Sequence, residues 1–174
     1  MIGLPDLASS PDQDIPAAPP ADFDPAQARK LILAGKAPPP SWRPWIKVLD
    51  LSRSDIVNLS PLAGLSALCE LYLRQTGVAD ISPLANLTKL QWLILDDTKI
   101  TNIASLSGLV NMTWLSIKMT AVSDLTPLAR WRKLRFLDVT SSRVTHAEAL
   151  SHIKGLDIRG IAGGKPGVRS KAAR

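Results

Sequence analysis

The sequence predicts an α/β fold: a right-handed solenoid with short parallel strands on its concave face and short helical or 3-10 segments on its convex side. Two observations predict it. Apolar residues recur every 22 positions through most of the chain, and each period joins a brief alternating apolar segment to a short segment that in three rows begins with Ser-Pro or Thr-Pro. A single row is too small to bury its own apolar side chains, so the rows must stack on one another.

The period is visible as eight aligned columns over four consecutive rows. Two of these columns form the apolar part of each strand: Leu71, Leu93, Leu115 and Leu137, and then Leu73, Leu95, Ile117 and Val139. One further row lies upstream, from Ile46 to Leu65. A pattern of this extent does not arise by chance, so its columns identify the residues that face the core.

The last row is shorter than the others. Ile153, Leu156 and Ile158 fit the strand pattern if this row loses three residues, whereas strict spacing would place an arginine in the core. We expect the slipped register, because it keeps Arg159 out of the apolar interior.

Within one row, the pattern L-x-x-L-x-L alternates apolar and variable residues and predicts a short parallel strand whose leucines point inward. Pro61, Pro83 and Pro127 each follow Ser or Thr and predict helix starts, because the hydroxyl can cap the first amides and proline suits the first helical position. About one helical turn, of the tighter 3-10 type, fits before the next strand.

N-terminal to the repeats, Asp24, Pro25, the segment 26–34 and Gly35 supply an N-cap, a first-turn proline and a stop, and so predict a short helix. The end of this helix is expected to cover the open end of the first repeat with Leu31, Ile32 and Leu33. The prolines and tryptophans of segment 38–45 predict a rigid lead into the solenoid, with a proline-rich ligand for another domain as the alternative.

The chain is expected to form one domain with two tails, since 174 residues are too few for two ordinary globular domains and their linkers. The first part is a disordered, acidic and proline-rich arm (1–22), followed by an N-terminal helical cap with its lead-in segment (23–44). A solenoid of about five repeats (45–160) and a disordered, basic and glycine-rich tail (161–174) complete this division.

The pattern L-x-x-L-x-L-x-x-T-x-V-x-D-I-S-P-L-A-x-L, carried by residues 68–87, resembles the leucine-rich-repeat family, specifically the 22-residue class of internalins and related phosphatase-regulating proteins. The resemblance covers residues 45–160 and implies a leucine-rich-repeat solenoid that binds proteins, either host surface proteins or an enzyme. The chain departs from the family in one column, where the usual Asn after the strand is replaced by hydroxyl residues such as Thr76 and Thr98. We expect these hydroxyls to bond backbone groups of the adjoining coil.

The net charge of +6 is unevenly distributed along the chain. The first 24 residues hold five aspartates and no Lys or Arg, whereas the basic residues after Ile158 have no acidic counterpart, which weakens the case for a nucleic-acid surface on the fold.

The single Cys69 excludes an internal disulfide and suits a reducing compartment. Without a signal-like N-terminus or an apolar stretch of spanning length, the expected location is cytoplasmic; export without a cleaved signal is the alternative.

No group of residues in the sequence has the pattern of a catalytic or metal site. His146 and His152 have only Glu148 nearby as a carboxylate, which is a weak metal constellation. Cys69 has no neighbouring histidine, and the segment 163–165 lacks the strand and helix of a phosphate-binding loop. We therefore predict no enzyme activity, no cofactor and no metal.

The variable strand positions form columns on the concave face, in which neighbours are about 4.8 Å apart. Three columns run along it: Val48, Glu70, Trp92, Trp114 and Phe136; Asp50, Tyr72, Ile94, Ser116 and Asp138; and Ser52, Arg74, Asp96, Lys118 and Thr140. An aromatic centre beside mixed charges is typical of a protein-binding patch. The predicted partner-binding residues are Glu70, Tyr72, Arg74, Trp92, Ile94, Trp114, Lys118, Phe136 and Asp138.

An alternative is that Trp92, Trp114 and Phe136 only stack on one another and shield the sheet, as cross-strand neighbours do. Binding is favoured because a row of aromatic side chains on a water-facing surface exposes more apolar area than a monomer usually tolerates.

The predicted function is a non-catalytic protein-interaction module that binds a partner protein through the concave strand face. One alternative is an exported effector or adhesin-like protein that acts on a host protein. Another is a nucleic-acid-associated scaffold that uses the tail and the basic cluster of Arg130, Arg132, Lys133 and Arg135. This cluster flanks Trp131, which the period assigns to the core, so a solvated face is preferred over a nucleic-acid contact. A monomer is expected unless the open C-terminal end pairs.

Overall fold

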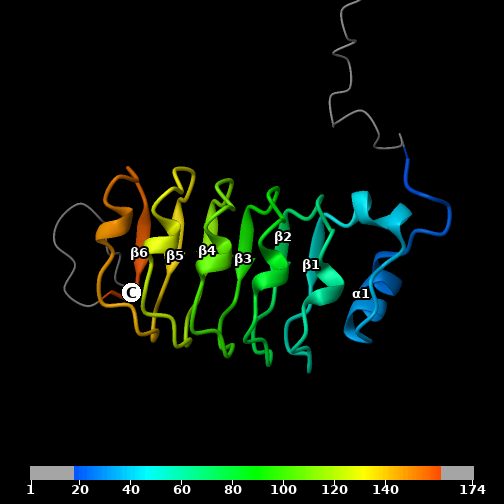
Figure 1. Cartoon of the computed structure of the whole chain (residues 1–174), viewed down its shortest axis with the longest axis horizontal. Coiled ribbons are helices and arrows are strands. Elements are labelled where there is room, and N and C mark those ends of the chain that lie inside the picture. Colours follow the sequence, from blue (N-terminus) through cyan, green and yellow to red (C-terminus); the bar gives the residue numbers. More distant parts are fainter. Residues whose placement is uncertain (1–17, 162–174) are drawn as a thin grey trace, which may run out of the picture.

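The computed structural model describes residues 18–161 and shows a row of stacked coils with one sheet along its length (Figure 1). All pairings in the sheet are parallel, and the strand order follows the sequence from β1 to β6. The strands are β1 (Val48–Asp50), β2 (Glu70–Tyr72), β3 (Trp92–Ile94), β4 (Trp114–Ser116), β5 (Phe136–Asp138) and β6 (Asp157–Arg159). The predicted fold class, a solenoid of short parallel strands and short helical turns, is therefore confirmed.

The leucine columns form one continuous core along the stack. Side chains such as Leu71, Leu93 and Leu115 are 0% exposed, and the core extends from α1 to the last strand. Each such burial removes a whole leucine side chain from water, which stabilises the fold by roughly 1.5–3 kcal/mol. Because every coil contacts only its neighbours, this core is built one coil at a time.

Five 3-10 segments return the chain from one strand to the next: Ser60–Leu62, Ser82–Leu84, Ala104–Leu106, Thr126–Leu128 and Glu148–Leu150. The prediction that Pro61, Pro83 and Pro127 mark helix starts is confirmed, but the prediction that the preceding Ser or Thr caps these three segments was wrong, because none of them has a side-chain cap hydrogen bond. Instead, an Asn or Asp two positions earlier accepts from the first amide, as Asp80 Oδ1 does from the Ser82 N–H at 2.8 Å. The same bond recurs at Asn58, Asn102 and Asp124.

The hydroxyl column also bonds differently from the prediction. Thr76 Oγ1 donates to the carbonyl of Leu73 at 2.8 Å, and Thr98 and Thr120 repeat this bond within their own coils, not to the adjoining coil. The residue before each threonine has a left-handed backbone, such as Gln75 at φ 55, which turns the chain back towards that carbonyl. Neighbouring coils are joined there by main-chain bonds instead, such as the 2.9 Å bond from the Gln75 amide to the Asp96 carbonyl.

The last coil is one residue shorter than the others, not three as predicted. Ile158 pairs with Leu137, 21 positions earlier, while Leu156 keeps the 22-residue spacing from Leu134. The residue is lost between Leu156 and Ile158, at the start of β6. The expectation that Arg159 stays out of the core is confirmed, since its side chain is exposed on the outward face of the sheet.

Helix α1 (Pro25–Leu33) lies beside β1 at the N-terminal end of the stack (Figure 1). Asp24 caps it by accepting from the Ala26 N–H at 2.8 Å. One face of the helix is buried through Ala28 and Ile32, both 1% exposed, and Arg29 Nε donates to the Asp50 carbonyl of β1 at 2.7 Å. The helix therefore closes this end of the sheet.

Of the three residues expected to pack from α1, Ile32 is buried, Leu31 is partly buried and Leu33 is 36% exposed. The expectation was wrong for Leu33, because consecutive residues of a helix point in different directions and only one face meets the repeats. The lead-in 3-10 segment Pro40–Trp45 buries Trp42, whose ring meets Phe23 edge-on with centroids 5.9 Å apart.

The disorder expected of segments 1–22 and 161–174 falls almost wholly outside the described residues, as does the glycine-rich segment 163–165. Among the described residues, no helix combines the length and apolar character needed to cross a bilayer.

Candidate functional site

The outward columns of the sheet line a hollow of about 610 Å³ that extends from β1 to β6, here called the groove. The strand register places Glu70, Trp92, Trp114 and Phe136 in one row and Tyr72, Ile94, Ser116 and Asp138 in the next. All predicted partner-binding residues except Glu70 line the groove. Glu70 lies beside it, where it is bonded to Tyr72.

The aromatic side chains of the first row form a stack. The rings of Trp92 and Trp114 have centroids 4.3 Å apart and planes 5° apart. The ring of Phe136 continues the stack at 3.8 Å from Trp114, and the Arg159 guanidinium lies over its far face at 4.8 Å from the centroid. Such contacts between aromatic neighbours and with a cation each stabilise a fold by about 0.5–1.5 kcal/mol.

This stacking covers the ring faces and leaves less apolar surface in the groove than the sequence suggested. Phe136 is only 8% exposed, while Trp92 and Trp114 are half-buried. The geometry therefore supports part of the alternative expectation, that the aromatic residues shield the sheet. Trp92 and Trp114 present to the groove only the part of their rings that the stack leaves uncovered.

A buried carboxylate organises the centre of the groove. Asp96 is 5% exposed, and its Oδ1 accepts from Ser116 Oγ at 2.5 Å and from the Lys118 N–H at 3.1 Å. Its Oδ2 faces Lys118 Nζ at 3.6 Å. Both oxygens thus have partners, which is the condition under which a buried charge is tolerated.

Asp138 is held in a similar way at the C-terminal side. Its Oδ1 accepts from Thr140 Oγ1 at 2.5 Å and from the Thr140 N–H at 3.0 Å, and it is 8% exposed. Together with Phe136, it was predicted to be offered to a partner. Their burial gives both residues mainly a supporting position beneath the surface of the groove.

The N-terminal side of the groove presents charges without ionic partners. Tyr72 Oη donates to Glu70 Oε2 at 2.7 Å, and this bond, with burial and nearby carboxylates, raises the pKa of Tyr72 to about 12. The hydroxyl is therefore a donor at neutral pH and orients Glu70. Among the described residues, the ion pairs are Lys118–Asp96 and Arg159–Asp157, so neither Glu70 nor the exposed Arg74 is neutralised.

Several residues that line the groove were not among the predicted partner-binding residues. Arg53 and Arg159 contribute guanidinium groups at the two ends of the groove, and Arg53 Nε donates to Gln75 Oε1 at 3.2 Å. Arg159 could not be placed from the period because the last coil changes register. Asp50, by contrast, belongs to a recognised outward column and could have been included.

The remaining chemically active side chains occupy separate places. His152 Nε2 lies 2.9 Å from the Trp131 carbonyl, whereas His146 Nδ1 lies 2.7 Å from Thr145 Oγ1. Cys69 Sγ bonds the Ala67 carbonyl at 3.4 Å. Within the described residues, no three His, Cys, Asp or Glu side chains are grouped so that they could hold a metal ion.

No family model matches this sequence, and no curated protein matches it. Among solved structures, the fold resembles an internalin, InlF, from Listeria monocytogenes, with a TM-score of 0.64 and 24% identity over 76% of this chain and 47% of that one. It also resembles the functional domain of InlJ from the same organism, with a TM-score of 0.63 and 19% identity over 74% of this chain and 27% of that one.

The chain spans less than half the length of either structure. The InlJ domain includes a cysteine ladder, whereas Cys69 is the single cysteine here. At these identities the likeness concerns the fold, and it agrees with the repeat pattern, the parallel sheet and the 3-10 segments. The chain therefore has the fold of a leucine-rich-repeat solenoid, similar to that of these two internalin structures.

Proposed function

We propose that this chain is a non-catalytic protein-interaction module that binds a partner protein in the groove. The observation that carries the proposal is the layout of the groove, where half-buried aromatic and aliphatic side chains lie on the sheet beside charged side chains, of which Glu70 and Arg74 have no ionic partner. Protein-binding sites combine an apolar centre with a polar rim in this way.

The exposure of each residue divides the site into contact and support. Tyr72, Trp92, Ile94 and Trp114 are half-buried and supply the apolar and aromatic contact surface, with the exposed Arg74 at its rim. The contact surface also includes the half-buried Glu70 and Lys118. Beneath it lie the buried residues Asp96, Ser116, Phe136 and Asp138.

The hydrogen bonding of the sheet favours this function. Tyr72, Trp92, Ile94 and Trp114 extend from main chain that is bonded on both sides, because each of strands β2, β3 and β4 pairs with two neighbours. A preformed surface loses little conformational freedom when a partner binds, so more of the contact energy remains as affinity.

A pull-down with wild type and three variants of the full chain tests the proposal. The double variant Tyr72→Ala/Arg74→Glu changes the contact surface without touching the aromatic stack, and Trp92→Ser/Trp114→Ser removes the stack itself. Val57→Ser, an exposed apolar residue that is 60% exposed outside the groove, is the matched control. A partner retained by wild type and control should be lost from both groove variants.

Direct binding of the captured protein, purified, is then measured for each form, together with thermal unfolding. Loss of binding by Tyr72→Ala/Arg74→Glu at an unchanged melting temperature supports the groove as the binding site. Equal affinity of wild type and both folded groove variants would show that binding takes place elsewhere.

A further inference from the structure

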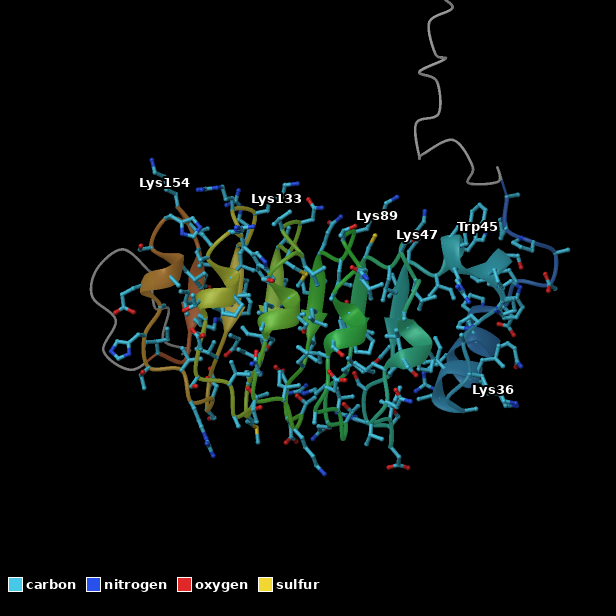
Figure 2. The ribbon with its side chains drawn as sticks, in the orientation of Figure 1. Lys36, Trp45, Lys47, Lys89, Lys133 and Lys154 are labelled. Atoms are coloured by element: carbon cyan, nitrogen blue, oxygen red, sulfur yellow. The ribbon has the colours of Figure 1, made fainter. Side chains whose placement is uncertain are left out.

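One edge of the solenoid carries a row of basic side chains that the groove does not use. It is the edge at which the strands begin, and Figure 2 shows Lys47, Lys89, Lys133 and Lys154 along it, with Trp45 at one end. We call this row the basic edge; its members are Lys47, Lys89, Arg130, Arg132, Lys133, Arg135 and Lys154, all exposed.

The repeat makes this row straight. Lys89 and Lys133 are 44 positions apart, which is two coils of 22, and Lys47 and Arg135 are 88 positions apart, which is four. Equivalent positions in a parallel stack lie on a line, with about 4.8 Å between neighbouring strands. From β1 to β6 the basic edge therefore extends about 24 Å, and its cations can meet a flat surface together.

At the edge where the strands begin, the carboxylates in the part of the chain that the structure describes are those of Glu70 and Asp157, the first residues of β2 and β6; Glu70 accepts from Tyr72 and Asp157 faces Arg159. The segments immediately before the strands (43–47, 64–69, 86–91, 108–113, 130–135 and 152–156) contain no Asp or Glu. Lys133 Nζ donates to the neutral Asn111 Oδ1 at 2.6 Å, so its charge is not cancelled. The segments that carry the basic edge thus contribute only positive charge.

The opposite edge, where the strands end, has a different composition. Between the strand ends and the 3-10 segments, it carries four exposed carboxylates, together with basic residues such as Lys99 and Arg143. These carboxylates belong to Asp55, Asp80, Asp97 and Asp124. The molecule is therefore charged asymmetrically across the sheet, and a negative surface would orient it with the basic edge inward.

The apolar residues of the basic edge decide which anionic surface fits it. Val110, 43% exposed, precedes β4 on the coil between those of Lys89 and Lys133, and the half-buried Trp45 lies at the end of the row. Trp131, within the densest group of cations, is 0% exposed and cannot stack on a base. Stacking contributes much of the affinity of proteins for single-stranded nucleic acid, whereas valine and tryptophan are compatible with a lipid interface.

We infer that the basic edge is a docking surface for an anionic lipid bilayer, with its cations on the headgroup phosphates and carboxylates. Each Lys or Arg near such a surface contributes to the attraction, which falls off within a Debye length. Because the strands run from the basic edge to the opposite edge, the groove opens along the plane of the bilayer. Bilayer docking leaves it accessible and is independent of the proposed partner binding.

The test is co-sedimentation of the full chain with vesicles of phosphatidylcholine mixed with phosphatidylserine, and with vesicles of phosphatidylcholine alone. Arg132→Glu/Lys133→Glu alters the basic edge, and Lys99→Glu/Arg143→Glu is its matched control on the opposite edge. Each replaces two exposed positive charges by two negative ones, so the net charge changes by four units in both. The residues after position 161 are the same in both variants and contribute equally.

Wild type should bind the anionic vesicles, should lose this binding as salt is added, and should not bind the neutral vesicles. The affinity of Arg132→Glu/Lys133→Glu should fall about tenfold or more, and that of the control much less. Lys47→Glu/Lys154→Glu, at the two ends of the row, should weaken binding as well and provides a second reading if the first variant folds poorly.

Three outcomes would overturn the inference. Equal losses for the edge variant and its control would show that net charge alone governs adsorption. Binding to neutral vesicles as strongly as to anionic ones would remove the electrostatic basis. Salt-sensitive binding to a fluorescent DNA or RNA duplex, without binding to anionic vesicles, would assign the edge to nucleic acid.

Discussion

The two faces of the sheet follow different rules although they belong to the same strands. Leu93 and Ile94 are adjacent in β3, yet Leu93 is 0% exposed in the core and Ile94 is half-buried in the groove. The inward columns repeat nearly the same residue in every coil, whereas the outward columns change from aromatic to acidic to basic. Stacking constrains only the inward face, so the outward face is free to carry specificity.

The largest expected difference between the faces concerns stability. Leu93→Ala should lower the free energy of unfolding by about 2–5 kcal/mol, because it leaves a cavity between two coils. Ile94→Ala, one residue later, should cost about 1 kcal/mol or less, since its side chain is already partly in water. Denaturant unfolding of both variants measures this difference. If both variants lose the same free energy of unfolding, the groove face contributes as much to stability as the core does.

A smaller effect is expected where the outward face itself contains buried charge. Asp96→Ala should cost about 1–3 kcal/mol, because the buried Ser116 hydroxyl loses its acceptor and Lys118 loses its carboxylate. The exposed Asp55 is the matched control, and Asp55→Ala should change the unfolding free energy by about 0.5 kcal/mol or less. If denaturant unfolding gives the same free energy of unfolding for Asp96→Ala and Asp55→Ala, the Asp96 bonds do not organise the groove.

The Tyr72–Glu70 bond gives the groove a spectroscopic signal. Glu70→Gln should lower the pKa of Tyr72 from about 12 towards its ordinary 10, because the largest cause of the rise is the bond to the carboxylate. Tyr72 is the single tyrosine, so tyrosinate absorbance during a pH titration reports on it alone.

The sign of the linkage follows from this raised pKa. The bond contributes fully to stability below pH 10 and is lost as the pH rises towards 12. A titration in which wild type and Glu70→Gln coincide would contradict the bond and the orientation of Glu70 that depends on it.

The smallest effect on stability is expected outside both faces of the sheet, in the turns that precede the 3-10 segments. Bonds from the side chain and amide of Thr126 hold the pKa of Asp124 below its ordinary 3.8. The stabilising contribution is therefore present above that value and is lost as the pH falls through the folded-state pKa. Asp124→Ala should lower the melting temperature slightly at neutral pH, and this difference should vanish in acid.

Ser123→Ala, at the exposed neighbouring position, is the control for Asp124→Ala and should leave the melting temperature unchanged. A difference that persists in acid would assign the effect of Asp124 to something other than its ionised carboxylate.

The predicted and observed site agree where periodicity alone places a residue. Trp92 and Trp114 fall in one outward row because parallel strands in register align every position of a repeat. The depth of Phe136 and Asp138 was not predictable in the same way. It depends on the stacking of rings and on the Thr140 bonds, which are tertiary contacts.

Two incorrect predictions, of the residue that caps each 3-10 segment and of the register in the last coil, have a common cause. Two polar columns, the Ser or Thr before proline and the Asn or Asp two positions earlier, recur with the same period, so the pattern could not show which one caps the turn. The path of the backbone decides it, by bringing Asp80 and not Ser82 to the free amide. In the last coil, the place of the lost residue likewise follows from which apolar side chain fits beside Leu137.

The sequence by itself determined the solenoid, the inward columns and the rows of the groove, because a 22-residue period allows only one way to bury its leucines. The tertiary structure decided how side chains within those rows meet. The ring stack, the Asp96 bonds and the position of Arg159 all depend on distances between different coils. Periodicity specifies which residues are neighbours, whereas the orientation of each side chain results from packing against all of its neighbours at once.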